Sequence, residues 1–385
     1  MTWRYLDHAA TTPARPEVVE AMVPLLTEGY GNPSGAHALA REARTAIDRA
    51  RELVADAAGC GPGDVVFTSG GTEADNLALR GVVAARPGRV VCTAIEHDAV
   101  LAVVHALGGT VVGVDRHGLV DLDQLAAALD DDVSVVSVQL VNNEVGSIQP
   151  LDAVADLVRS RSPRAVLHTD AAQALCWLDL APAVAAADLI TLASHKCGGP
   201  KGTGALIVRP GVPLASQTLG GGQERDRRSG TQDVAGAVGF ATAARAAQAE
   251  RAELVARVTP WREALFAALT AIPGALASAA PDGDRSHVVP GIVNVCFPAV
   301  DSEALLFLLE QEHRLLASAA SSCASGAQGP SHVLTAIGVP AALAQGSLRL
   351  SIGWPTTDAD VQAALTAVPT VVDRLQRHAR DGAPA

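Results

Sequence analysis

Aromatic residues and positive charge are both scarce in this chain of 385 residues. Only 3% of the residues are aromatic although 49% are hydrophobic, so we expect a core built mainly from Ala, Val and Leu. Lys and Arg number 29 against 41 Asp and Glu, which gives a formal net charge of -12. Broad binding to nucleic acid or to an anionic membrane requires a basic face, so this charge argues against both functions.

Long apolar runs and paired cysteines are also missing. The N-terminal residues lack the apolar core of a signal peptide, and no apolar run is long enough to span a bilayer, so we expect a cytoplasmic location. The cysteines contain no CxxC pair, and no two of them have the usual spacing of zinc ligands. We therefore expect free thiols and no metal site. The six cysteines are Cys60, Cys92, Cys176, Cys197, Cys296 and Cys323.

Short β-rich runs alternate with Ala- and Leu-rich helical patterns from residue 65 to about residue 210. This alternation is typical of a largely parallel sheet that is covered by helices on both faces. Ligands bind such sheets at the carboxyl ends of the strands. The expected strands are Val65–Thr68, Arg89–Ala94, Thr110–Asp115, Val133–Leu140, Ala165–Asp170, Leu189–Ser194 and Ala205–Arg209.

A different pattern begins after Thr231. A long Ala-rich helix is expected from Val234 to about Val258. Strands at 292–297 and 348–352, and helices at 302–310 and from Asp358 onward, follow it.

The length of the chain and this change of pattern favour two domains. We predict an α/β fold in which residues 16–254 form a large domain around a mostly parallel, seven-stranded sheet. Residues 1–15 and 255–385 are predicted to form a smaller α+β domain that carries the loop around Cys323.

Asp170 and Lys196 lie at the ends of two expected strands that follow one another along the chain. Taken singly, they would be a helix-capping aspartate and a surface lysine. Together they suit pyridoxal phosphate, because a lysine can hold the aldehyde carbon while an aspartate keeps the pyridine nitrogen protonated. The pair therefore predicts a site for this cofactor.

The run Ser69-Gly70-Gly71-Thr72-Glu73 follows a strand and opens a helix. Two glycines allow close backbone approach, and a helix N-terminus attracts an anion, so the run can cradle a phosphate. An ordinary capped turn between a strand and a helix is the alternative, and this segment alone favours it.

Two other glycine-rich runs are less informative. Residues 198–204 lack the Gly-Lys-Thr order of a nucleotide-binding loop and are interpreted as the turn by which the chain re-enters the sheet. Residues 220–225 form either a flexible loop or an edge of the active site, and the sequence leaves both open.

Three further side chains have two interpretations each. His97 can stack on a cofactor ring or transfer protons, or it can simply begin a helix. Asn143 can donate to a ring oxygen, or it can belong to a turn. Arg349 lies in an apolar strand and needs a partner there, which can be a substrate carboxylate or an internal acid.

Cys323 has small and polar neighbours that are poorly suited to a core. Most unpaired cysteines are buried small hydrophobes, whereas a thiolate on a loop can reach a substrate and then an acceptor. We therefore expect Cys323 to be the reactive thiol, with Cys197 as a weaker candidate.

With these residues in hand, the chain resembles the cysteine desulfurases, which are pyridoxal-phosphate enzymes of fold type I in the class V aminotransferase group. The resemblance covers nearly the full length, and the order and spacing of its motifs are specific. The matching segments are Tyr5–Pro13, Gly31–Pro33, Phe67–Glu73, Glu96–His97, Asn142–Gly146, Asp170–Gln173, His195–Lys196, Arg228–Thr231, Cys323 and Pro330–Leu334.

The resemblance implies a division of chemical work. Lys196 would bind the cofactor covalently and shuttle protons. His97 would stack on the ring and assist proton transfer, and Asp170 would pair with the pyridine nitrogen. Arg349 would hold the substrate carboxylate. Cys323 would attack the sulfur of L-cysteine, which would release alanine and leave a persulfide on the enzyme.

The resemblance also implies the remaining contacts to the cofactor. Gln173 and Asn143 would contact the ring oxygen and the substrate. Gly71, Thr72 and His195 would hold the phosphate. Thr231 would reach that phosphate from the second subunit of a homodimer.

The resemblance further implies a protein acceptor for the sulfur. The loop around Cys323 has the longer form associated with transfer to an iron–sulfur scaffold or to a tRNA-thiolation carrier, and Cys323 could transiently ligate an iron–sulfur cluster. Ala193 stands where many relatives have a phosphate-binding serine. The alternatives are a selenocysteine lyase, a sulfur donor for one pathway, and a non-catalytic subunit of a sulfur-transfer complex.

Overall fold

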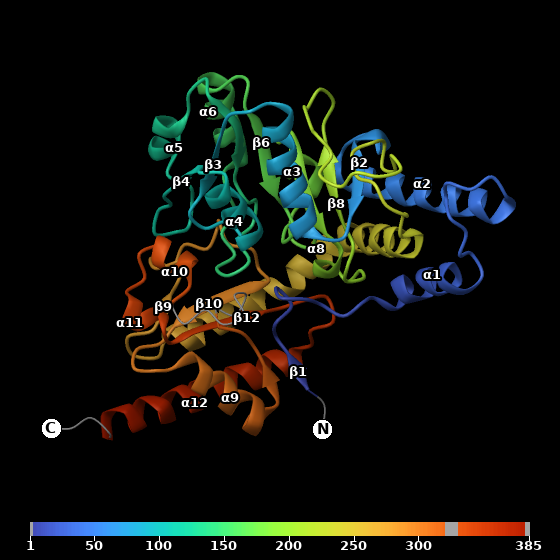
Figure 1. The fold of residues 1–385 in the computed structure, drawn as a ribbon. Helices are drawn as coiled ribbons and strands as arrows, with labels where there is room; N and C mark the ends of the chain where they lie inside the picture. The colour runs from blue at the N-terminus through green and yellow to red at the C-terminus, as the bar shows by residue number, and fades with distance from the viewer. Residues whose placement is uncertain (1–2, 320–329, 382–385) are drawn as a thin grey trace.

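The computed structural model describes residues 3–319 and 330–381. Its main feature is a seven-stranded sheet with the order β2-β8-β7-β6-β5-β3-β4. β8 runs antiparallel to both β2 and β7, and the other pairs are parallel. The predicted α/β fold with a mostly parallel sheet is confirmed (Figure 1). The strands are β2 (Val65–Thr68), β3 (Arg89–Thr93), β4 (Thr110–Val112), β5 (Val133–Ser137), β6 (Val166–Asp170), β7 (Leu189–Ala193) and β8 (Gly204–Val208).

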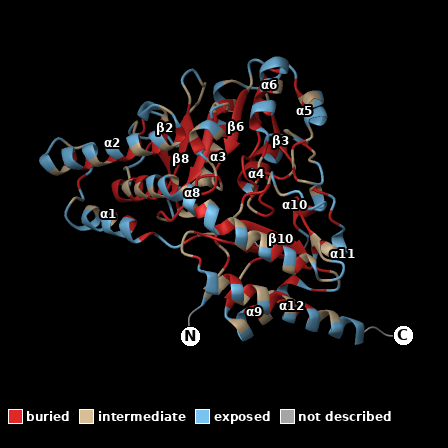
Figure 2. Ribbon diagram, turned by 180° about the vertical axis from the view of Figure 1, so that it is seen from behind, coloured by how far each residue is buried: buried red, intermediate tan, exposed pale blue. Residues whose placement is uncertain are grey.

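Successive residues of these strands face opposite layers of helices. Val66 packs in a cluster with α3 (Gly71–Ala85) and α4 (Asp98–Ala106) on one face. Its neighbours Val65 and Phe67 pack on the other face in the larger cluster that includes α2 and α8. Figure 2 shows the sheet buried between these layers. Further helices are α1 (Pro16–Thr27), α2 (Ala38–Ala58), α5 (Leu122–Ala128), α6 (Leu151–Arg161) and α7 (Leu180–Ala183).

Helix α8 (Val234–Thr270) begins where the sequence predicts, since the side chain of Asp233 accepts a hydrogen bond from the amide of Gly236. The expected end near Val258 is wrong. The helix continues through Pro260, although a proline removes one backbone hydrogen bond inside a helix. Buried residues on both sides of Pro260 hold this helix, so that it extends from the large sheet to β10 (Figure 1).

A second, antiparallel sheet has the order β12-β10-β9. A two-stranded parallel sheet joins β1 near the N-terminus to β11, and Asp7 forms a bridge with Ser351. The N-terminal segment therefore lies against the C-terminal part of the chain, while the domain boundaries at 15/16 and 254/255 remain a prediction. These elements are β1 (Arg4–Tyr5), β9 (Leu276–Ala277), β10 (Ile292–Cys296), α9 (Ser302–His313), β11 (Leu315–Leu316), α10 (His332–Ala336), α11 (Ala341–Ala344), β12 (Ser347–Ser351) and α12 (Asp358–Asp381).

Within residues 3–319 and 330–381, none of the helices combines the length and the apolar character needed to cross a membrane.

Candidate active site

The strand ends at one edge of the large sheet bring the predicted residues together. β2, β5, β6 and β7 all run in the same direction, so their carboxyl ends share this edge. Asp170 is the last residue of β6, and it is in register with Thr191 of β7. The short helix η2 (Ser194–Lys196) follows β7 directly, and α3 follows β2. A carboxylate, a lysine and a helix N-terminus are therefore delivered to one place.

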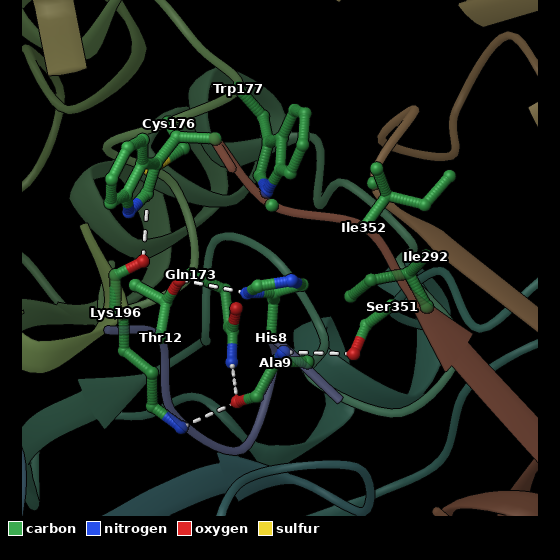
Figure 3. A pocket seen from close by; sticks show the side chains of 13 residues that line it. His8, Ala9, Thr12, Gln173, Cys176, Trp177, Lys196, Ile292, Ser351 and Ile352 are labelled. Atoms are coloured by element: carbon green, nitrogen blue, oxygen red, sulfur yellow. Dashed lines mark hydrogen bonds between the residues drawn. The ribbon is translucent and has the colours of Figure 1, made fainter. Parts of the chain in front are cut away.

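The ammonium group of Lys196 is held by the N-terminal segment. Its Nζ donates a hydrogen bond to the carbonyl oxygen of Ala9 at 2.6 Å (Figure 3). It also donates to the carbonyl oxygen of Ala10 at 2.9 Å. Nε2 of Gln173 donates to the same oxygen of Ala9 at 2.8 Å. Nδ1 of His195 lies 3.1 Å from Oγ1 of Thr11. Residues 9–11 thus form one wall of the site and connect three of the predicted residues.

Asp170 is buried, and its carboxylate accepts a hydrogen bond from the amide of Ala172 at 2.9 Å. Burial raises the pKa of Asp170, whereas the nearby charges of His97 and Lys196 lower it. In the described part of the chain Asp170 has no ion-pair partner within 4.0 Å. A buried carboxylate without a close cation favours binding of a positively charged group.

Behind Asp170 lies a buried polar network that the sequence interpretation missed. His168 belongs to the same strand, and its two ring nitrogens lie 2.9 Å from Oγ of Ser137 and 3.1 Å from Oγ1 of Thr191. Burial lowers the pKa of His168 to about 3. Nε2 of His168 is 3.5 Å from Oδ1 of Asp75, which is too long for a hydrogen bond. The position of His168 two residues before Asp170, on the same strand face, was the available signal.

The network also contains two further buried acids. Burial, followed by the charge of Asp170, raises the pKa of Asp75. Burial raises the pKa of Glu96 to about 8, although its carboxyl group accepts hydrogen bonds from Oγ1 of Thr93 and from the amide of Gln139. The raised pKa of Glu96 favours its neutral form at pH 7, and the pKa of Asp75 is shifted in the same direction.

Arg349 has the internal partner that the sequence left as one alternative. Its side chain is fully buried, and Nη2 donates to Oδ1 of Asp7 at 2.8 Å. Nη1 donates to the backbone oxygen of Asn143 at 2.9 Å. Nε has no hydrogen-bond partner in the described part of the chain. Asp7 was missed because it lies 342 residues away in the sequence.

The N-terminus of α3 lacks the cap that the alternative interpretation requires. Gly70 is the N-cap residue and has no side chain with which to cap this end of the helix. Glu73 instead reaches back to the amide of Ser69, with 2.7 Å between Oε2 and N. A Cβ atom on Gly204 would come within 2.8 Å of the backbone of Gly70, so the close approach of the two strands requires glycine there. The amides of Gly71 and Thr72 are left for an anion.

Cys323 lies outside the described residues, but the segments on either side of it contact the site. Ser318 pairs with the backbone of Arg349. On the other side, Oγ of Ser331 donates to the buried carboxyl group of Glu144, and Nε2 of His332 lies 3.0 Å from the backbone oxygen of Glu96. Burial raises the pKa of Glu144 to about 7.

The other five cysteines are free thiols that are poorly suited to nucleophilic chemistry. Cys60 is half-buried and the remaining four are buried. Burial raises the pKa of Cys60, Cys176 and Cys296 to about 11, and it raises the pKa values of Cys92 and Cys197 further. Cys197, the weaker candidate, is therefore held in the thiol form.

A small cavity beside Lys196 is lined by His8, Gln173, Cys176 and Trp177 (Figure 3). Its free volume of about 20 Å³ accommodates roughly one water molecule. It is too small for a cofactor. Among the described residues, no cluster of His, Cys, Asp and Glu is arranged to hold a metal ion.

Comparison with known proteins gives consistent matches. The family model for class V aminotransferases matches residues 4–364. An IscS-like cysteine desulfurase of Mycobacterium tuberculosis is 42% identical, with 99% of each chain covered. A cysteine desulfurase IscS of Methanosarcina thermophila is 39% identical, covering 97% of this chain and 92% of the relative. A solved NifS-like protein superposes with a TM-score of 0.87 and 32% identity, covering 99% of this chain and all of the other.

Proposed function

This chain belongs to the cysteine desulfurase family of the class V aminotransferases, and from that premise we propose its reaction and the residues that perform it. L-Cysteine and the thiol of Cys323 are converted to L-alanine and a persulfide on Cys323. The carbon–sulfur bond of the substrate breaks, a sulfur–sulfur bond forms, and the thiol proton is balanced by the new carbon–hydrogen bond of alanine. The acceptor of the persulfide sulfur is a scaffold or carrier protein.

The observation that carries this proposal is the convergence of Asp170, Lys196 and the uncapped N-terminus of α3 at one sheet edge. These groups fit pyridoxal phosphate. The buried carboxylate of Asp170 suits a protonated pyridine nitrogen, Lys196 supplies the amine, and the amides of Gly71 and Thr72 suit the phosphate. When bound, the cofactor supplies an electron sink for negative charge that develops on the substrate.

The remaining predicted residues orient the reactants. His97 caps the N-terminus of α4, where its Nδ1 accepts a hydrogen bond from the amide of Ala99, so it begins a helix as one interpretation of the sequence expected. Its stacking on the ring is proposed from the family resemblance. Gln173 and His195 are fixed by Ala9 and Thr11 on the wall that also holds Lys196.

Arg349 binds the substrate carboxylate in this proposal, with Asp7 as its partner while the substrate is absent. Lys196 moves protons from its position near Ala9, and the side chain of Asn143 faces the substrate.

We propose that the enzyme is a homodimer in which Thr231 completes the partner's phosphate site. Thr231 is exposed, and its side chain makes no hydrogen bond in the described part of its own chain. Helix α1 supports this assembly, because Val19, Val23 and Leu26 are exposed on one face of it. A second copy would cover this apolar stripe.

The test measures alanine and persulfide formation from L-cysteine. The wild-type protein is expected to form both, and Lys196→Ala neither. Cys323→Ala is expected to lose transfer of sulfur to a protein acceptor, whereas Cys60→Ala, which changes a half-buried thiol elsewhere, keeps it. Full sulfur transfer by Cys323→Ala would contradict the proposed role of Cys323.

A further inference from the structure

The segment 220–231, which the sequence leaves as either a flexible loop or a site edge, contains an unusual backbone. Glu224, Arg225 and Asp226 have φ values of 48°, 57° and 62°. Three successive non-glycine residues in the left-handed region are energetically unfavourable. Such conformations persist only where the surrounding structure fixes them, and they concentrate at functional sites.

The carboxylate of Glu224 fixes this turn. Glu224 and Arg51 are both buried, and Arg51 donates to the two carboxylate oxygens at 2.7 and 2.8 Å. Oε2 also accepts from the amide of Phe67 at 2.9 Å, and Oε1 accepts from Gln232. Burial alone would raise the pKa of Glu224, but the hydrogen bonds from Arg51 outweigh it and the pKa is lowered. The turn is therefore anchored by an ionised, bidentate pair.

The same segment is attached to both sides of the proposed phosphate cradle. Phe67 belongs to β2, just before the cradle, and Glu224 binds its amide. Nε of Arg228 donates to Oε1 of Glu73 at 2.7 Å, and Glu73 also accepts from the amide of Ser69 within the cradle. The left-handed turn and Arg228 thus fix the path of the chain immediately before Thr231.

We propose that Glu224 is a positioning residue for cofactor binding: it locks the turn at 224–226 so that Thr231 is presented to the phosphate in the site of a second copy of this chain. This inference rests on the proposed cofactor and homodimer. Segment 220–231 is accordingly a rigid edge of the partner's site.

The first experiment uses Glu224→Gln, which keeps the size of the side chain and removes its charge. The affinity of the dimeric apoenzyme is measured for pyridoxal phosphate and for pyridoxal, which lacks the phosphate. The affinity for pyridoxal phosphate is expected to fall about tenfold, as for loss of one well-placed hydrogen bond to a charged group, while the affinity for pyridoxal stays unchanged. Glu312→Gln, which breaks an exposed pair with Arg374, is the matched control and should change neither.

Equal losses of affinity for both compounds would mean that Glu224 only stabilises the fold, and unchanged affinities would mean that it has no role; either result overturns the inference. Arg51→Lys keeps the charge but not the bidentate geometry. It is expected to give a smaller loss in the same direction, and it replaces Glu224→Gln if that variant does not fold. A wild-type protein that bound no pyridoxal phosphate would instead refute the proposed function.

Mixed dimers test whether Glu224 acts on the partner. In one dimer, a chain with Lys196→Ala and Glu224→Gln is paired with a wild-type chain. In the other, a Lys196→Ala chain is paired with a chain carrying only Glu224→Gln. Binding is measured at the one site of each dimer that keeps Lys196. We expect this site to lose its preference for pyridoxal phosphate over pyridoxal in the first dimer and to keep it in the second. The reverse result would show action within one chain and would overturn the inference.

Discussion

At the scale of single residues, the site depends on a buried carboxylate whose charge is balanced from several sides. Burial raises the pKa of Asp170, and His97 and Lys196 lower it. The acids behind it, Asp75 and Glu96, have raised pKa values. Among these three acids, Asp170 is the one whose pKa the charges of His97 and Lys196 lower, which favours it as the partner of a cation at the sheet edge.

Replacing Asp170 with Asn removes the negative charge but keeps a side-chain oxygen that can accept the hydrogen bond from Ala172. The neutral amide of the variant is not able to hold a pyridine nitrogen in its protonated form, so kcat/KM for L-cysteine is expected to fall by about a hundredfold or more. The apoprotein should lose no thermal stability, because the buried charge is removed. Steady-state kinetics and thermal denaturation of the apoprotein measure the two effects. Wild-type kcat/KM in Asp170→Asn would contradict the role assigned to Asp170.

The raised pKa of Glu96 predicts how stability depends on pH. Between its ordinary pKa of 4.5 and its folded value of about 8, the unfolded chain has released a proton that the folded chain keeps. The contribution of Glu96 to the free energy of unfolding is therefore fully present below pH 4.5 and is lost as the pH rises through 8. Each pH unit inside the window costs up to about 1.4 kcal/mol of unfolding free energy.

Glu96→Gln should consequently make the decline in unfolding free energy between pH 6.5 and 8 shallower. His168 does not contribute to the slope in this range. Because its pKa is lowered in the folded protein, its stabilising contribution increases with pH only up to its ordinary pKa of 6.5 and stays constant above that. Urea denaturation at several pH values in this range gives the slope. An identical slope in Glu96→Gln and the wild type would show that Glu96 ionises normally in the folded protein.

At this scale, the sequence did not predict the hydrogen-bond partners that come from distant parts of the chain. The sequence identified Asp170, Lys196 and Arg349 as a carboxylate, an amine and a guanidinium in suitable elements. It did not show that Asp7 pairs with Arg349, or that Ala9 accepts from Lys196, since both contacts join the N-terminus to residues far along the chain. The roles of the site residues remain predictions that the variants above test.

At the scale of elements, hydrophobic pattern predicted the strands better than their ends. The expected strand 110–115 stops at Val112, because Val114 instead pairs with Val120 in an isolated bridge. The expected end of α8 was wrong because tertiary packing outweighs local signals such as Pro260. The buried residues that follow Pro260 keep the chain helical. The mostly parallel sheet was predicted because strands that alternate with helices permit few arrangements, whereas the order of its strands was not predicted.

Helix α1 provides a prediction at this scale. Leu26 is 63% exposed, so Leu26→Glu is expected to leave the fold intact but to weaken the proposed homodimer, because a charge would be buried in the apolar stripe. Sedimentation should show a shift towards the monomer. Phe307→Glu on α9, where an equally exposed aromatic residue is changed, is the control and should remain dimeric. A fully dimeric Leu26→Glu protein would place the interface elsewhere.

At the scale of the whole molecule, the N-terminal segment connects the C-terminal part of the chain to the edge of the large sheet. It pairs with the C-terminal part of the chain through β1 and Asp7, and its residues 9–11 contact Lys196, Gln173 and His195 beside the large sheet. The proposed substrate-binding residue Arg349 and the proposed cofactor-binding residue Lys196 are therefore both held by the N-terminal segment.

The most direct test of the account uses the lysine content of the chain, which has only Lys196 and Lys201. The protein is loaded with pyridoxal phosphate, reduced with borohydride, digested and analysed by mass spectrometry. The account predicts a phosphopyridoxyl group on Lys196 in the wild type and in Lys201→Arg, and none in Lys196→Ala. A group attached to Lys201, or one retained in Lys196→Ala, would contradict it.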